Sequence, residues 1–139
     1  MPLPVAQGLR PSMLYQLKTR KKILDVARDL EAAAQRHKFG IMGVIDLRAK
    51  MQEKGVAYDR DCLIVEVCNP QQAKKVLENH PEISTVLPCR ISLYAEGGEV
   101  VVATVKPTAM MEMFRAAGLD ETARDVERTL TVIMEEACR

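Results

Sequence analysis

The chain has 139 residues, of which 47% are hydrophobic and only 4% aromatic, so we expect one domain with a core of aliphatic and methionine side chains. Its 20 basic and 19 acidic residues give a net charge of +1, which argues against nucleic-acid binding, because phosphate recognition needs an excess of clustered basic charge. The N-terminal segment lacks a signal-peptide pattern, and no apolar run approaches the ~18 residues of a membrane span, so we expect a cytoplasmic protein without membrane contact. In that compartment the four cysteines are expected to be thiols.

Strands and helices alternate in the first half of the predicted fold. Residues 1–12 are rich in proline and glycine and read as a flexible lead-in to a single domain over residues 13–139. A short strand over 13–18 precedes a helix with apolar residues at helical spacing, which ends before Gly40. The expected elements that follow are a strand over 41–47, a helix over 48–55 and a strand over Cys62–Cys68.

The next helix has clear boundary signals. Asn69 is a favourable N-cap, Pro70 suits the first helical position, and Gln72 stands where a capping box has Glu or Gln. The side chains of Ala73, Val76 and Leu77 form the apolar side of this helix.

A β-hairpin and two helices complete the chain. Gly97-Gly98 permits the positive φ angles of a two-residue turn, so residues 90–96 should pair with Glu99–Val105. We expect a helix from Pro107 that stops at Gly118, and a last helix capped by Asp120. One apolar stripe of the last helix comprises Val126, Leu130, Ile133 and Ala137.

The element order β-α-β-α-β-α-β-β-α-α predicts an α/β (α+β) fold with a mainly antiparallel five-stranded sheet and helices on one face. Strand parity assigns Leu63, Val65 and Val67 to the core face, and places Glu66 and Cys68 on the other. Both faces of the strand over 100–105 are apolar, so we expect a symmetric homodimer that covers the second face of the sheet.

Four segments in this order resemble a known family. They are KFGIMGVIDL, EVCNP, LPCRISLY and the glycine-tipped hairpin, and together they resemble the bacterial and archaeal family called domain of unknown function 302. The resemblance covers about residues 13–115, and its most specific part is the Cys-Asn-Pro motif followed by the Leu-Pro-Cys motif. It implies a fold similar to one repeat of the TATA-binding protein and a tendency to dimerise. It implies no established activity.

Two cysteines beside prolines are the main candidates for a functional site. Cys68 ends a predicted strand directly before a helix N-terminus, where the helix dipole would favour a thiolate and lower its pKa. Glu66, on the same strand face, would oppose this. A packing role explains Cys68 equally well, as a small apolar residue against Ala73. Cys89 opens the hairpin after Pro88 and can likewise be a core residue.

Our leading hypothesis is a cysteine-centred binding site for thiol redox, sulfur or metal handling. In this hypothesis Cys68 is the reactive thiol and Cys89 is its resolving or co-ligating partner, provided that the two are close. Arg90 or Tyr94 would orient an anionic or sulfur-bearing ligand. The full set of candidate site residues is Cys68, Cys89, Asn69, Arg90, Tyr94 and Glu66.

The alternative is a non-enzymatic module that binds an apolar small ligand or a protein partner. Its binding surface would be the open sheet face or the helix that carries Met110, Met111, Met113 and Phe114, because methionine-rich surfaces adapt to varied ligands. The sequence has no G-x-S-x-G, H-E-x-x-H, C-x-x-C or phosphate-loop motif, so it favours a non-enzyme and assigns no catalytic residue, metal or cofactor.

Overall fold

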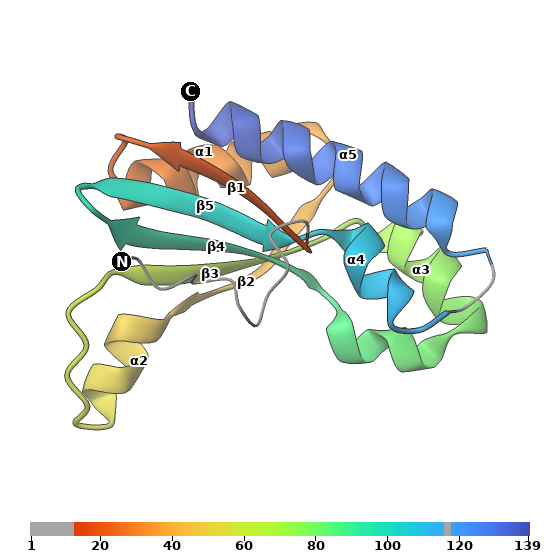
Figure 1. The fold of residues 1–139 in the computed structure, drawn as a ribbon, viewed down its shortest axis with the longest axis horizontal. Helices are drawn as coiled ribbons and strands as arrows, with labels where there is room; N and C mark the ends of the chain where they lie inside the picture. The colour runs from red at the N-terminus through yellow and green to blue at the C-terminus, as the bar shows by residue number, and fades with distance from the viewer. Residues whose placement is uncertain (1–12, 116–117) are drawn as a thin grey trace, which may run out of the picture.

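Five antiparallel strands form one sheet in the order β1-β5-β4-β3-β2 (Figure 1). The computed structural model describes residues 13–115 and 118–139, so the predicted lead-in over 1–12 lies outside the described residues. The strands are β1 (Leu14–Thr19), β2 (Gly40–Asp46), β3 (Cys62–Cys68), β4 (Cys89–Glu96) and β5 (Glu99–Val105). The sheet confirms the predicted α+β class and its antiparallel pairing.

The helices lie in two groups (Figure 1). Two long helices, α1 (Ile23–Arg36) and α5 (Asp120–Ala137), pack together over one face of the sheet. A second group gathers at the end of the sheet where β3 finishes and β4 begins, and consists of α3 (Pro70–Asn79), the short 3₁₀ helix η2 (Pro81–Val86) and α4 (Pro107–Glu112). Helix α2 (Leu47–Glu53) stands apart at the opposite end. No helix in the described part of the chain is long and apolar enough to cross a bilayer.

The core lies between the sheet and the two long helices. Strand parity predicted the core face of β3 correctly, and the neighbouring strand β4 buries its alternate residues on the same face. The buried residues of the two strands are Leu63, Val65, Val67, Cys89, Ile91 and Leu93. The helices contribute Val26 and Leu30 from α1 and the predicted stripe residues Leu130 and Ile133 from α5, each at most 1% exposed. Removal of these apolar side chains from water is the main force that holds the two layers together.

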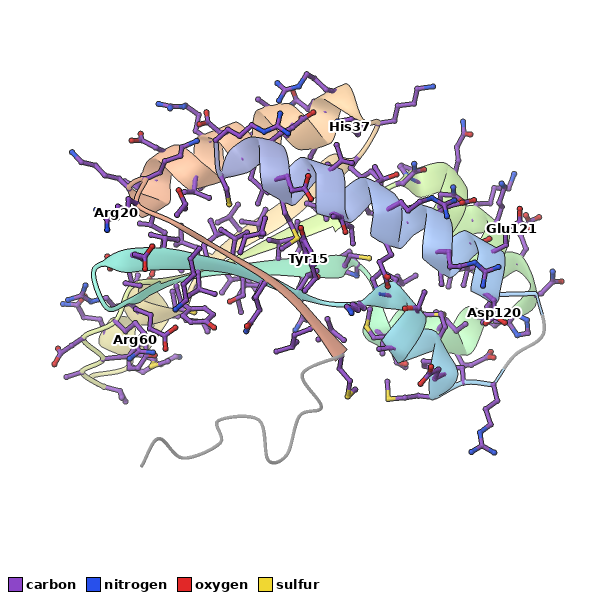
Figure 2. All side chains as sticks on the ribbon, turned by 45° about the horizontal axis from the view of Figure 1, so that its top comes forward. Tyr15, Arg20, His37, Arg60, Asp120 and Glu121 are labelled. Carbon is purple, nitrogen blue, oxygen red and sulfur yellow. The ribbon has the colours of Figure 1, made fainter. Side chains whose placement is uncertain are left out.

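Polar contacts fix α5 over the sheet at its C-terminal end. Tyr15 of β1 donates a hydrogen bond to Glu135 Oε1 at 3.0 Å, and Arg36 Nη2 lies 2.9 Å from Glu136 Oε2. His37, at the end of α1 beside α5 (Figure 2), lies 3.1 Å from the other oxygen of Glu136. The hydrogen bonds from His37 and, second, from Arg36 lower the pKa of the Glu136 carboxyl. With its C-terminal half held, the first turns of α5 extend toward α3 and α4.

Several predicted boundaries differ from the structure, and three of these differences have a clear local cause. Asp120 is the first residue of α5 rather than its cap, and the N-cap is the buried Leu119, whose backbone angles are already in the helical region. The helix from Pro107 ends at Glu112 instead of near Gly118, because the left-handed φ of 48° at Arg115 stops the following turns from continuing it. Strand β2 ends at Asp46, whose carboxylate accepts from the Ala49 N–H at 2.9 Å and starts α2.

The second face of β5 is less exposed than the sequence suggested. Val101 and Ala103 are only 2% and 7% exposed in the single chain, and Val105 is 37% exposed. The predicted homodimer would cover this face. The homodimer stays a prediction, and the exposed apolar area of β5 that supports it is smaller than the sequence suggested.

Candidate functional site

An apolar pocket lies at the end of the sheet where α3, η2, α4 and the first turns of α5 converge. Asp120 and Glu121 mark those first turns of α5 in Figure 2. The pocket has a cavity volume of about 50 Å³. Residues from the sheet end and from all four helical elements line it: Phe39, Val67, Cys68, Asn69, Gln72, Ala73, Val76, Ile83, Leu87, Cys89, Pro107, Met110, Met111, Leu119, Thr122, Ala123 and Val126. Apolar side chains therefore dominate its walls.

The two candidate cysteines meet at this pocket. Cys89 pairs with Val67 across β3 and β4, so Cys68 stands one register position beyond the partner of Cys89. Strict alternation would put the two thiols on opposite faces of the sheet. Cys68, however, is the last residue of β3, where the chain turns into α3, and both cysteines line the pocket.

Both thiols are harder to ionise than a thiol in water. Burial raises the pKa of Cys89 to about 11, and the nearby Cys68 adds to this shift. Burial also raises the pKa of Cys68. The expected lowering of the Cys68 pKa by the helix dipole is therefore wrong in direction. Two N–H groups at this helix N-terminus already donate to Asn69, and the apolar walls disfavour a negative charge.

Asn69 forms the predicted helix cap. Its Oδ1 accepts from the backbone N–H groups of Gln71 and Gln72 at 3.0 and 3.1 Å. Pro70 takes the first helical position, as predicted. The cap fixes the direction in which α3 leaves β3, and thereby places Gln72, Ala73 and Val76 in the pocket wall.

The predicted capping box is incomplete. In that motif the Gln72 side chain would reach back to the Asn69 backbone N–H. Instead Gln72 Oε1 is buried, and it is the one buried side-chain oxygen or nitrogen of residues 13–115 and 118–139 that has no hydrogen-bond partner in the protein. Since a buried polar atom without a partner costs about 1–3 kcal/mol, Gln72 needs an explanation other than helix capping.

A second, polar pocket adjoins the first. It has a cavity volume of about 240 Å³ and lies between the start of α3 and the middle of α5. The two pockets share Phe39, Asn69, Gln72 and Val126, and the polar pocket adds Asp125, Arg128 and Thr129. Arg128 and Asp125 form an ion pair with each other. Gln72 thus lines both the apolar pocket and the polar pocket.

The other predicted site residues lie elsewhere. Glu66 and Arg90 pair across β3 and β4, with Arg90 Nε 3.6 Å from Glu66 Oε2. Gly43 of β2 pairs with Glu66, and a Cβ at Gly43 would stand 3.2 Å from Glu66 Oε1, so the glycine leaves room for this carboxylate. Tyr94 pairs with Cys62, near the opposite end of β3 from Cys68. Glu66, Arg90 and Tyr94 do not line the apolar pocket.

Several wall residues were missed as site residues. Ile83 and Leu87 come from η2 and the residue after it, a segment without a predicted element. Leu119, Thr122 and Ala123 come from the start of α5. In the described residues no three His, Cys, Asp or Glu side chains gather in a way that could hold a metal ion.

Comparison with known proteins identifies the family. The family described as domain of unknown function DUF302 matches residues 15–137. The crystal structure of an uncharacterised conserved DUF302 protein from Bacillus stearothermophilus is similar to this chain, with 30% sequence identity and a TM-score of 0.86. The match covers 91% of this chain and 98% of that one. No curated protein matches the chain. The chain therefore belongs to the DUF302 family, as its sequence resemblance predicted.

Proposed function

We propose that this protein is a binding module that holds a small apolar molecule in the pocket between the end of the sheet and α3, α4 and α5. The observation that carries the proposal is the lining of this pocket, in which apolar side chains from the sheet and four helical elements converge. Ligand sites in proteins are concave, mostly apolar and supplied with a few polar groups. This pocket fits that description.

The size of the cavity sets the size of the ligand. One water needs ~10–15 Å³ of such volume, so the cavity of about 50 Å³ has room for a molecule of a few heavy atoms. Met110 and Met111 form part of the wall contributed by α4. Because methionine side chains are unbranched and change rotamer easily, this wall can adjust to ligands of different shape.

The cysteines contribute to an apolar surface in this proposal. Both are free thiols, and burial raises the pKa of each, so both are protonated near neutral pH. A neutral buried thiol behaves as a small apolar group, whereas a reactive cysteine needs a lowered pKa. The raised values favour ligand packing over thiol redox chemistry.

Methionine methyl groups offer a direct test. In protein with ¹³C-labelled methionine methyl groups, titration with cyclopentane should shift the Met110 and Met111 signals in a saturable way. The Met113 signal serves as internal control, because this side chain is 64% exposed and lies outside the pocket. Unchanged Met110 and Met111 signals at saturating cyclopentane would overturn the proposal.

A pair of matched variants sharpens this test. Ala73 lines the pocket, so Ala73→Leu should fill it and abolish the shifts. Ala32 lies on the exposed side of α1, so Ala32→Leu adds the same side chain elsewhere and should leave the titration as in the wild type. Equal titrations of the two variants would mean that cyclopentane binds at another place.

The convergence of sulfur atoms supports a second candidate, a site for monovalent copper. Cys68, Cys89, Met110 and Met111 all line the pocket, and thiolate and thioether ligands select Cu(I). Binding would require the thiols to lose protons, which their raised pKa values oppose. Competition with a Cu(I) chelator separates the candidates: a copper site requires tight binding that is lost in both Cys68→Ser and Cys89→Ser.

A further inference from the structure

We propose that the ligand is a neutral amphiphile, an alcohol or similar molecule with one hydrogen-bond donor, whose apolar part fills the apolar pocket and whose donor binds Gln72 Oε1. This inference rests on the proposed function, since it names the class of ligand for the same pocket. Three observations carry it: the buried acceptor of Gln72, the polar pocket beside the apolar one, and the paired charges of that polar pocket.

The first observation concerns what Gln72 can recognise. A glutamine Oε1 is a hydrogen-bond acceptor only. In this chain it is buried and lacks a partner in the protein, and it does not form the capping-box bond to the Asn69 N–H. A ligand group that donates a hydrogen bond would remove the cost of this buried acceptor. An ether or hydrocarbon of the same size would leave it unpaired.

The second observation gives the ligand two ends. Gln72 lines both the apolar pocket of about 50 Å³ and the polar pocket of about 240 Å³. A molecule whose polar end is at Gln72 can therefore place its carbon chain among apolar side chains while its polar end meets Asn69 and Thr129. A wholly apolar molecule would use only one of the two compartments.

The third observation makes the polar end neutral. Among the residues that line the polar pocket, the charged ones are Asp125 and Arg128, and they pair with each other. Their charges offset each other, so the lining has no net charge that would favour a carboxylate or an ammonium group. An anionic end would also lie close to the Gln72 carbonyl oxygen, which repels it. A hydroxyl group avoids both costs.

Two isomeric probes test the inference in the wild-type protein. 1-Pentanol and 1-methoxybutane have the same atoms, but only the alcohol can donate a hydrogen bond. One net hydrogen bond predicts that 1-pentanol binds about fivefold more tightly, and that pentanoate binds more weakly than 1-pentanol. The methionine methyl titration described above measures all three. Equal affinity of the two isomers, or tighter binding of pentanoate, overturns the inference.

Substitutions test whether the preference for 1-pentanol over 1-methoxybutane depends on the Gln72 side chain. Gln72→Met keeps the length of the side chain without its amide, so the ratio of the two affinities should fall to about one. Gln71→Met is the matched control, because Gln71 is the exposed neighbour on α3 and lines neither pocket, and it should keep the wild-type ratio. A preference that survives Gln72→Met overturns the inference.

The outcome also separates this inference from the proposed function. Suppose that cyclopentane binds and that 1-pentanol and 1-methoxybutane bind with equal affinity. The apolar pocket then remains a binding site, and only the proposed role of Gln72 is contradicted. If none of the probes binds, the proposed function fails, and the assignment of the ligand class fails with it.

Discussion

Cys68 lies one register position beyond Val67, the partner of Cys89, and both cysteines line the same apolar pocket. Two thiols in this relationship share one environment, and that environment disfavours charge on either. This explains why the thiol at the mouth of a helix does not become a thiolate. Desolvation by burial raises the pKa of Cys68, although the thiol precedes a helix N-terminus.

The raised pKa of Cys89 predicts a loss of stability in alkaline solution. An unfolded thiol ionises near 9.0, whereas the folded one keeps its proton until about pH 11. Between these values the unfolded state binds fewer protons than the folded state, so the free energy of unfolding falls as pH rises, by up to ~1.4 kcal/mol per pH unit for one group. Urea unfolding of wild type and Cys89→Ala from pH 8 to pH 11 measures the difference. Parallel pH dependences in the two proteins would contradict the burial of the thiol.

Loss of the Asn69 cap should destabilise the fold. Asn69 Oδ1 accepts from two backbone N–H groups at the start of α3, so Asn69→Ala should lower the free energy of unfolding by ~1 kcal/mol. Asn69→Asp keeps an acceptor at the same place and is the control, which should retain nearly full stability. An unfolding midpoint equal to that of the wild type in Asn69→Ala would show that α3 does not depend on this cap.

The hairpin turn should tolerate asparagine in place of Gly97 better than alanine in place of Gly98. Gly97 and Gly98 have φ angles of 60° and 82°, the left-handed conformations of a two-residue turn. Gly98→Ala should cost ~1–2 kcal/mol because of the clash of its Cβ in that conformation. Gly97→Asn should be nearly neutral, since asparagine readily adopts this conformation and Asn-Gly is a favoured pair here. Thermal unfolding of both variants decides the order, and a larger loss in Gly97→Asn would refute this description of the turn.

Arg90 should matter little to the pocket. Its guanidinium lies on the other face of the sheet, 64% exposed and beside Glu66. Exposed ion pairs contribute roughly 0–1 kcal/mol, so Arg90→Ala should change stability by no more than this and leave cyclopentane binding as in the wild type. A loss of cyclopentane binding in Arg90→Ala would contradict the placement of Arg90 outside the apolar pocket.

The fold was predictable where local patterns decide the structure. The Gly97-Gly98 pair indicates a tight turn, because both residues adopt positive φ angles there. The inward residues of β3 and β4 follow from the alternation of side chains along a strand. Asn69-Pro70 marks a helix start because the cap bonds to backbone atoms only two and three residues away. These signals do not depend on the rest of the chain, so the sequence contains them in readable form.

The site was predictable only in part, because it depends on packing between distant segments. The sequence singled out Cys68, Cys89 and Asn69, which do line the pocket. It missed Ile83 and Leu119, because a short 3₁₀ helix and the start of α5 have no periodic pattern that points to the end of the sheet. The direction of the Cys68 pKa shift was predicted wrongly for the same reason, because it depends on packing between distant segments. Local sequence shows the helix that follows the thiol, but not the walls that exclude water from it.

The most direct test of the pocket as a binding site is a crystal structure of the protein under xenon pressure. Xenon enters dry apolar cavities and scatters strongly enough to be located without ambiguity. The proposed function predicts a xenon atom in contact with Cys68, Ala73 and Cys89, and its absence in Ala73→Leu crystals. If the wild-type pocket instead contains only ordered waters, with no xenon at any pressure that the crystals tolerate, the apolar binding site is contradicted.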